Sequence, residues 1–446
     1  SLVPQRTQNP LQVGQYFKDS PDAARWMDRF YLFDVYGSPW FSAIYILLFI
    51  SLIGCVLPRT IEHFKAARAL PPATPKNLAR LEHHESWSPQ GNELELARAW
   101  FKSKRFRVLE VNGSISAEKG FTRETGNLFF HLALILVLLG ISFSSLFGMR
   151  GEAIVNVGER FVNTATSYDT LTYGKLFRDS NIPAFMVTAD KFVAQYNLET
   201  SAPEDYTLEV SLLREGATQI EKKTIKVNSP MTIGTTRVYL QANGYAPVVT
   251  VRDSKGDVAF QGPVTFLPQD ANLRSIGAIK VPDADPQIGF LGSFLPTYVR
   301  DGANGGASAF PKALNPRLLL SVWSGDLGLD SGIPQSVYRI DTTDMTQIGL
   351  KGLKPGESFA YEGGSITFEG YVQWVNLNFV ADPGKHLALL GGIVAILGLL
   401  ASLFTRRRRI WIRVGDQVEV AGLAKNAAPG LEVEMQGFVK MLKGEK

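Results

Sequence analysis

The stretch ETGNLFFHLALILVLLGISF, from Glu124 to Phe143, consists almost entirely of apolar residues and carries one histidine, His131, near its start. From Thr125 to Met149 the chain has no Asp, Glu, Lys or Arg. A helix of this length crosses a hydrocarbon layer of about 30 Å. The imidazole needs an explanation, because an ionisable side chain at membrane depth is costly unless it contacts protein, water or a metal.

Two further runs, Pro39 to Leu57 and Leu387 to Phe404, are equally free of charged residues. The mean hydropathy of the whole chain is near zero, so its apolar residues are concentrated in these runs. Buried helices of soluble proteins normally keep a polar face over such a length. The sequence therefore predicts an α-helical polytopic membrane protein with three visible spans.

A fourth, N-terminal span is expected to be missing from this chain. The chain begins with Ser1, and its opening SLVPQR resembles CVLPRT, Cys55 to Thr60, where the first apolar run ends. We therefore expect the natural protein to have another transmembrane helix near this N-terminus. Cys55 is the single cysteine, which excludes an internal disulfide, a cysteine-based metal site and a CxxC redox motif. The net charge of +4 is too small to indicate a nucleic acid partner.

Basic residues set the predicted orientation in the lipid bilayer. Arg59, Lys65 and Arg68 follow the first span, and the run Arg406–Arg409 follows the last. Both flanks are expected to be cytoplasmic by the positive-inside rule, and a stop-transfer anchor beside anionic lipid explains the arginine run. The predicted division, in chain order, is an extracytoplasmic loop with an amphipathic aromatic helix (1–38), a transmembrane helix (39–58), a cytoplasmic α+β segment (59–124), a transmembrane helix (125–149), an extracytoplasmic β-domain (150–386), a transmembrane helix (387–404) and a cytoplasmic tail (405–446).

The N-terminal loop contains SPDAARWMDRFYLFDVYGSPW. Ser20 is a favourable N-cap, and Pro21 suits the first helical position. Trp26, Phe30 and Phe33 then recur at the spacing of one helix face. Two interpretations remain open: a helix at the outer membrane interface with an aromatic belt, or an aromatic platform for a flat ligand.

The predicted cytoplasmic segment has helix and hairpin signals. A helix is expected over residues 92–104, followed by two strands around Asn112-Gly113, the preferred pair for a type I′ turn. His83 and His84 lie in LEHHESW. A solvated loop is the preferred interpretation of this stretch over a metal site, because no cysteine is nearby.

Residues 150–386 alternate apolar and polar positions between turn residues, for example in FMVTADKFVAQY and SITFEGYVQWVNLNFV. RDSKGDV is typical of a hairpin tip. This pattern predicts a large all-β, sandwich-like domain. Between His131 and His386 there is no other histidine, and the domain has no GxSxG, HExxH or P-loop motif. A holding or docking surface is therefore favoured over a hydrolase or redox enzyme.

His131 lies four residues beyond Asn127, about 6 Å into the membrane at ~1.5 Å per residue. Three interpretations remain open for it. It is an axial ligand of haem iron, a neutral hydrogen-bonding residue between helices, worth about 1 kcal/mol, or part of a proton relay. The proton relay is the weakest of the three, because the three apolar runs contain no Asp or Glu and no histidine besides His131. His386, at the outer end of the last span, is interpreted as an interfacial residue rather than a ligand.

The chain as a whole resembles the ResB (CcsB) family of cytochrome c biogenesis proteins, in its actinobacterial form. The resemblance rests on long strings in the expected order along essentially the entire chain. They include GSPWFSAIYILLFISLIGCVLPR, SAEKGFTRETGNLFFHLALILVLLG, VYLQANGYAPVVTVRD, FLPQD, GDLGLDSGIPQSVY, ADPGKHLALL and SLFTRRRRIWIRV.

This resemblance implies a multi-pass protein of the bacterial plasma membrane with four spans and a large domain between the third and fourth. It implies a ResC (CcsA)-type partner, which carries a tryptophan-rich segment absent here, with which haem b is shared. The family's intramembrane histidine corresponds to His131, which is thereby expected to bind the cofactor and its metal. No catalytic residue is assigned, and a non-catalytic subunit of a haem-transporting cytochrome c synthase is expected.

In system II maturation, such a pair moves haem outward and presents it to the CXXCH motif of apocytochrome c. Thiol-reducing maturation proteins are further candidate partners. The alternative is a non-catalytic membrane scaffold whose β-domain recruits partners without binding haem. A transporter in its own right is poorly supported, because the spans are few and none is broken by inward-facing polar residues.

Overall fold

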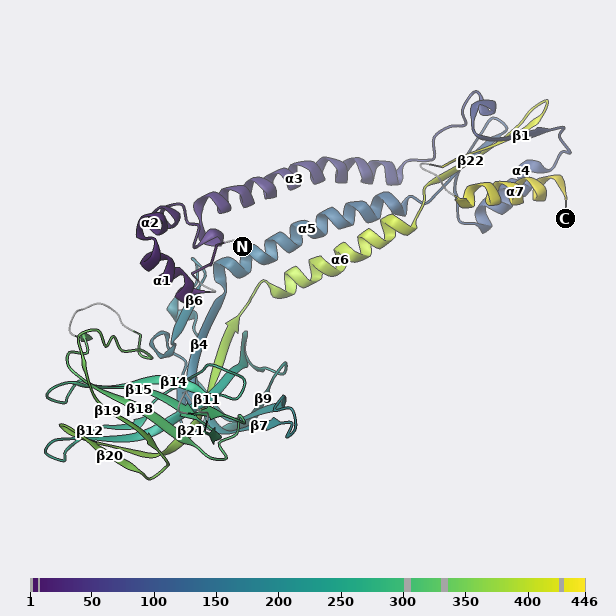
Figure 1. The fold of residues 1–446 in the computed structure, drawn as a ribbon. Helices are drawn as coiled ribbons and strands as arrows, with labels where there is room; N and C mark the ends of the chain where they lie inside the picture. Colours follow the sequence, from purple (N-terminus) through teal and green to yellow (C-terminus); the bar gives the residue numbers. More distant parts are fainter. Residues whose placement is uncertain (1–2, 7–8, 301–305, 330–335, 425–428, 446) are drawn as a thin grey trace. The chain divides into compact units, whose positions relative to one another are not determined.

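The computed structural model describes residues 3–6, 9–300, 306–329, 336–424 and 429–445, and Figure 1 traces the chain with its elements labelled. The chain forms two compact units. One unit comprises residues 1–142 and 384–446, and the other comprises residues 143–383. Ser1, on which the expectation of a missing span rests, lies outside the described residues.

The first unit begins with two short helices, α1 (Pro10–Asp19) and α2 (Pro21–Arg29). Pro21 occupies the first helical position of α2, as predicted, whereas the Ser20 side chain makes no capping hydrogen bond. A short 3-10 turn, η1 (Val35–Gly37), then leads into the first long helix.

The predicted aromatic face of α2 is only partly correct. Trp26 and Phe30 are exposed, and their rings stack with centroids 5.9 Å apart. Phe33 is fully buried instead, because α2 ends at Arg29 and the chain turns at Tyr31, whose φ is +59°. The helical spacing predicts a shared face only as far as the helix continues, so the prediction is wrong for Phe33.

Three helices of the described chain are long and apolar enough to cross a membrane, which confirms the three predicted spans. They are α3 (Pro39–Arg68), α5 (Thr122–Phe147) and α6 (Lys385–Phe404). The hydroxyl of Ser38 caps α3 by accepting a hydrogen bond from the backbone N–H of Phe41. Unlike its apolar run, α3 continues through Pro58 and ends at Arg68.

Small residues hold α5 and α6 at close range. A Cβ atom on Gly126 would lie 2.5 Å from the carbonyl oxygen of Gly398, and one on Gly140 would lie 2.6 Å from the backbone nitrogen of Ala388. Glycine therefore lets the two backbones approach in a way that a larger side chain would prevent, as is common for helices packed in membranes. The buried positions at this contact are Gly126, Ala133 and Gly140 of α5 and Gly391, Ala395 and Gly398 of α6.

The first unit also contains an α+β domain, which is built from the segment between α3 and α5 together with the segment after α6. Its antiparallel sheet has the strand order β1-β23-β22-β3-β2. The strands are β1 (His83–Trp87), β2 (Arg107–Val111), β3 (Ser114–Lys119), β22 (Arg408–Val414) and β23 (Val418–Ala424). Helices α4 (Glu93–Ser103) and α7 (Pro429–Lys443) pack on it, and the short η2 (Leu78–Arg80) precedes β1. The predicted segment 59–124 and tail 405–446 therefore form one domain.

Local predictions for this domain meet different outcomes. The helix expected over residues 92–104 is α4, and the turn Asn112-Gly113, with φ values of +48° and +72°, joins β2 to β3. His83 and His84 lie in strand β1, so the expectation of a loop is wrong. The reason is a long-range pairing, because β23 supplies the hydrogen-bond partners of β1.

The second unit, here called the β-domain, is built from antiparallel sheets, as predicted. Its seven-stranded sheet contains β4 (Met149–Asn156), β6 (Thr170–Tyr173), β10 (Met231–Ile233), β11 (Thr236–Asp253), β12 (Val258–Pro263), β20 (Ser358–Tyr361) and β21 (Gly364–Ala381). A four-stranded sheet contains β5 (Arg160–Val162), β7 (Phe185–Tyr196), β8 (Pro203–Arg214) and β9 (Glu221–Lys226). A five-stranded sheet contains β13 (Leu267–Pro268), β14 (Ser275–Val281), β15 (Ile288–Leu295), β18 (Arg317–Ser324) and β19 (Thr346–Leu353). Smaller elements are η3 (Ala165–Ser167), η4 (Asp179–Asn181) and the pair β16 (Tyr298–Val299) and β17 (Ala307–Ser308).

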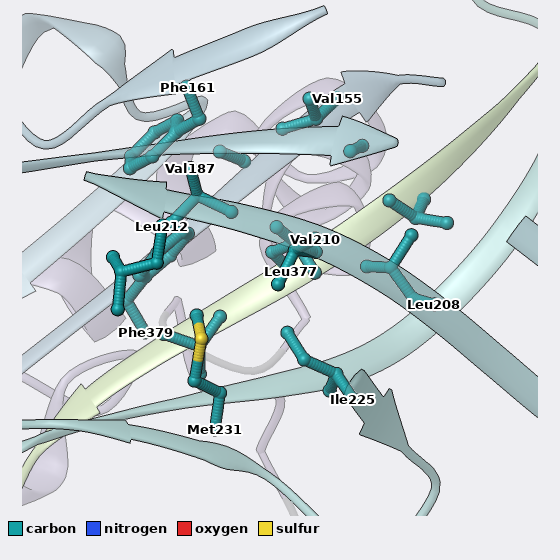
Figure 2. Close-up of a cluster of buried hydrophobic side chains, with 14 of the residues drawn as sticks. Val155, Phe161, Val187, Leu208, Val210, Leu212, Ile225, Met231, Leu377 and Phe379 are labelled. Atoms are coloured by element: carbon teal, nitrogen blue, oxygen red, sulfur yellow. The ribbon is translucent and has the colours of Figure 1, made fainter. Parts of the chain in front are cut away.

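Two hydrophobic cores divide this domain into two sandwiches that share strands β11 and β21. The first core lies between the seven-stranded and four-stranded sheets, and Figure 2 shows Val187, Val210, Leu377 and Phe379 within it. The second core joins the other halves of β11 and β21 to the five-stranded sheet. The predicted all-β, sandwich-like domain thus consists of two sandwiches built on one pair of long strands.

Trp374 of β21 lies near the point where β11 and β21 pass from one core to the other. Its ring N–H donates to the backbone carbonyl oxygens of Tyr245 and Phe266, both at 3.1 Å. Gly244 faces it across the strand pair, and a Cβ atom there would lie 2.5 Å from the indole ring. The glycine therefore provides the space in which the buried indole fits.

Candidate functional site

A cavity of about 520 Å³ lies between α3 and α5, at the ends of these helices next to the α+β domain. Its volume is in the range of small-molecule sites, roughly 300–1,000 Å³. The lining residues recur every three or four positions, so each helix contributes one face. They are Val56, Arg59, Glu62, His63 and Ala66 of α3 and Glu124, Asn127, Leu128 and His131 of α5.

His131 is half-buried, and its Nδ1 lies 2.7 Å from the backbone carbonyl oxygen of Asn127, one turn earlier in α5. A carbonyl oxygen only accepts hydrogen bonds, so Nδ1 is the protonated nitrogen when the imidazole is neutral. Nε2 then keeps its lone pair, and no described residue forms a hydrogen bond with it. Metal-ligating histidines commonly have this arrangement, with one ring N–H bound to a backbone carbonyl and the other nitrogen available.

The hydrogen bond of His131 also bears on the alternatives from the sequence. The bond stays within α5, whereas the helix–helix interpretation requires a partner on another helix. The ring of Phe130 lies edge-on to the imidazole, with centroids 5.2 Å apart. His131 therefore lines the cavity with its Nε2 available, between apolar residues such as Leu128 and the polar side chains of the same wall.

His63 is a second histidine of the cavity, and no sequence pattern above predicted a role for it. Its Nε2 lies 3.0 Å from the hydroxyl oxygen of Thr125, and its ring stacks on Phe121 with centroids 4.9 Å apart. The apolar run that predicts the first span ends at Leu57. The signal that was available is the spacing of Val56, Arg59 and His63, which continues one helix face beyond that run.

The charges around the cavity are unevenly compensated. The carboxylate of Glu124 lies 2.6 Å from Arg407, whose guanidinium also stands over the ring of Phe121. Arg59 and Glu62 have no ion pair or hydrogen bond from their side chains within the part of the chain that the structure describes. The cavity wall therefore combines one paired carboxylate with an unpaired carboxylate and an unpaired guanidinium.

Arg407 also connects the cavity to a buried carboxylate. The side chain of Glu118 is only 3% exposed and lies 2.5 Å from Arg407 and 2.9 Å from Arg409. Burial alone would raise the pKa of Glu118, but the hydrogen bonds and positive charges of the two guanidinium groups outweigh it and hold this pKa below its ordinary value. Glu118 is therefore ionised at neutral pH.

The arginine run after the last span has more than one role. Arg407 and Arg409 bind Glu118, and Arg408 lies 2.5 Å from Glu434 of α7. The interpretation of these three residues as a lipid anchor alone is therefore incomplete. They also join the end of α6 to the α+β domain.

The other histidines do not line the cavity. His84 Nε2 lies 3.7 Å from a carboxylate oxygen of Glu419, and His386 is exposed in the first turn of α6. Within the described ranges, no three His, Cys, Asp or Glu side chains are placed to share a metal ion. This finding applies to a bare ion, since haem iron takes only its axial ligands from protein.

Comparison with known proteins identifies the family. A model described as the ResB-like family matches residues 1–436. The chain belongs to this family. Among its relatives, "Cytochrome c biogenesis protein CcsB" of Microcystis aeruginosa is 23% identical over 418 residues, which cover 92% of this chain and 81% of the relative. Proteins of the same name from Gloeobacter violaceus and Synechococcus sp. strain JA-3-3Ab are 22% and 26% identical over 408 and 417 residues, covering 91% of this chain in each case and 77% and 76% of the relatives.

These relatives come from cyanobacteria. The actinobacterial subtype implied by the sequence resemblance therefore stays a prediction. The family assignment covers both units of this ResB-family chain, because the match extends from the N-terminal helices into α7.

Proposed function

We propose that this chain acts in system II cytochrome c biogenesis by holding haem, the cargo of the pathway, in the cavity between α3 and α5. His131 would supply one axial nitrogen to the haem iron, and a ResC/CcsA-type membrane partner would supply the other. The pair would then move haem outward and present it to apocytochrome c. The observation that carries this proposal is the available Nε2 of His131 at the wall of a cavity large enough for a small molecule.

The chemistry of His131 fits this role. Its Nδ1–H is held by the Asn127 carbonyl oxygen, which fixes the tautomer and orients the ring. Leu128 and Val56 supply apolar surface in the same cavity. A porphyrin needs such surface for its faces and a neutral imidazole for its iron.

The proposed orientation follows the distribution of basic residues. Arg59, Lys65 and Arg68 end α3, and the arginine run 406–409 follows α6. The positive-inside rule then places the α+β domain in the cytoplasm and the β-domain outside the plasma membrane. The cavity would open near the cytoplasmic surface, where haem is available, and the β-domain would be the surface that docks apocytochrome c.

The test is a visible spectrum of the full-length chain co-purified with its ResC/CcsA-type partner. The wild-type complex should have a Soret band with the sharp visible bands of low-spin iron. His131→Ala should lose haem, and imidazole added to a His131→Gly complex should restore the band. His63→Ala is the matched control, because it removes the other imidazole of the cavity, whose Nε2 already contacts Thr125; it should keep the spectrum.

Two results would contradict the proposal. A His131→Ala complex with wild-type haem content and spectrum would remove His131 as the ligand. A colourless wild-type complex that still supported cytochrome c assembly would favour the alternative, a scaffold that recruits partners through its β-domain without binding haem.

A further inference from the structure

The α3 side of the cavity carries a guanidinium, that of Arg59, with which no described residue forms an ion pair. Arg59 is the one arginine or lysine among the residues that line the cavity in the described structure. Its guanidinium has no hydrogen bond or ion pair there, while Glu124 on the opposite helix is already bound by Arg407. An anion that enters the cavity would therefore meet an unpaired guanidinium, and Arg59 is free to bind it.

The depth of Arg59 differs from that of His131. Arg59 follows the start of α3 at Pro39 by 20 residues, which is about 30 Å of helix and matches the thickness of the hydrocarbon layer. If the layer begins at Asn127, His131 would lie about 6 Å inside it, one helical turn further along α5. On this membrane position, the cavity would combine an imidazole inside the apolar layer with a guanidinium at its polar edge.

We propose that Arg59 binds the carboxylate edge of the porphyrin whose iron is held by His131. This inference rests on the proposed haem site and assigns a binding residue to the edge of haem that lies away from the iron. Haem carries its two carboxylates on one edge of the ring, away from the iron. A guanidinium is planar, always charged and able to form two parallel hydrogen bonds with a carboxylate, which suits it to this edge.

Glu62 provides an internal check on the role of charge. Its carboxylate lines the same cavity, three residues beyond Arg59, and no described residue forms an ion pair with it. Glu62 therefore repels a carboxylate ligand while Arg59 attracts it. If charge selects the ligand, removal of Arg59 and removal of Glu62 must have opposite effects.

The experiment compares haemin with haemin dimethyl ester, which has the same iron and ring but no ionised carboxylates. The full-length chain in phosphatidylcholine nanodiscs is titrated with each ligand, and the Soret shift gives two dissociation constants. The readout is the ratio of the ester's constant to that of haemin. The partition of each ligand into lipid is the same for all variants, so it cancels in the comparison.

Wild type should prefer haemin, and Arg59→Gln should lower this preference about tenfold, the effect of one charge-assisted contact at a solvated edge. Arg59→Lys should keep part of it, and Glu62→Gln should increase it. Lys65→Gln is the matched control, because Lys65 carries the same charge near the end of α3 but does not line the cavity. It should leave the ratio unchanged.

The inference is overturned if Arg59→Gln and Arg59→Lys both keep the wild-type ratio, or if Lys65→Gln lowers it equally. The proposed function is judged separately by His131→Ala. Binding of both ligands by His131→Ala with an unaltered Soret band would refute the proposed haem site. Loss of the band in His131→Ala, together with an unchanged ratio in Arg59→Gln, would refute only the role of Arg59.

Discussion

Substitution of Glu118 is expected to destabilise the α+β domain more than substitution of its exposed charged residues. Its side chain is 3% exposed and makes hydrogen bonds to Arg407 and Arg409. Each charge-assisted bond contributes roughly 1.5–3 kcal/mol, and breaking a buried ion pair costs about 3–5 kcal/mol. The two arginines are 20% and 31% exposed and regain some water, so we expect Glu118→Ala to lower the free energy of local unfolding by about 3 kcal/mol.

Hydrogen exchange of the full-length chain, resolved by mass spectrometry on peptides from β3 and β22, measures this change directly. A loss of about 3 kcal/mol corresponds to about 100-fold faster exchange in these strands. Glu110→Ala is the matched control, because Glu110 and its partner Arg98 are 42% and 55% exposed. Such a pair contributes about 0–1 kcal/mol. Equal effects of the two substitutions would refute the reasoning.

The pH dependence of hydrogen exchange in β3 and β22 tests whether ionised Glu118 stabilises the domain. The pKa of Glu118 is lower in the folded domain than in the unfolded chain, where it is about 4.3. Its stabilisation is therefore complete above this unfolded value and is lost as the pH falls through the folded pKa. The difference between wild type and Glu118→Gln should be constant from about pH 6 to 8 and should shrink below about pH 4. A difference that grows on acidification would contradict this assignment.

Two further predictions concern packing. Gly140→Leu should destabilise the α5–α6 contact by about 1–3 kcal/mol, because its Cβ atom would lie 2.6 Å from the backbone nitrogen of Ala388. Gly392→Leu is the control and should have no such effect, because a Cβ atom there has nothing within 4 Å. Thermal unfolding of the two variants in detergent measures the difference. Trp374→Phe should destabilise the β-domain by about 2–4 kcal/mol, because the carbonyl oxygens of Tyr245 and Phe266 lose the indole N–H as a shared donor. Proteolysis in increasing urea should cleave the variant at a lower urea concentration than wild type. Cleavage of both proteins at the same urea concentration would contradict the role of these hydrogen bonds.

The spans and much of the local structure could be predicted because their signals are contained in short stretches. The length of an uncharged run indicates a membrane span, and the residue pair Asn112-Gly113 alone indicates a tight turn. Strand β7 runs from Phe185 to Tyr196, the same residues whose alternation indicated a strand. In each case the deciding interaction lies within the element or with its immediate neighbour.

What the sequence did not reveal depends on partners far along the chain. His83 and His84 form a strand only because β23, more than 300 residues later, pairs with them. The two cores of the β-domain depend on β11 and β21 each crossing between sandwiches, which alternation alone does not report. His63 was missed because the apolar run and the helix end at different residues, Leu57 and Arg68.

The C-terminal segment and the cavity form one electrostatic unit. Arg407 binds Glu124 at the cavity wall and stands over Phe121, on which His63 stacks. Without Arg407, Glu124 would join Glu62 as a second uncompensated carboxylate in the space proposed for a ligand with two carboxylates of its own. The segment after α6 therefore contributes more than an anchor, because its Arg407 compensates one carboxylate of the cavity that His131 lines.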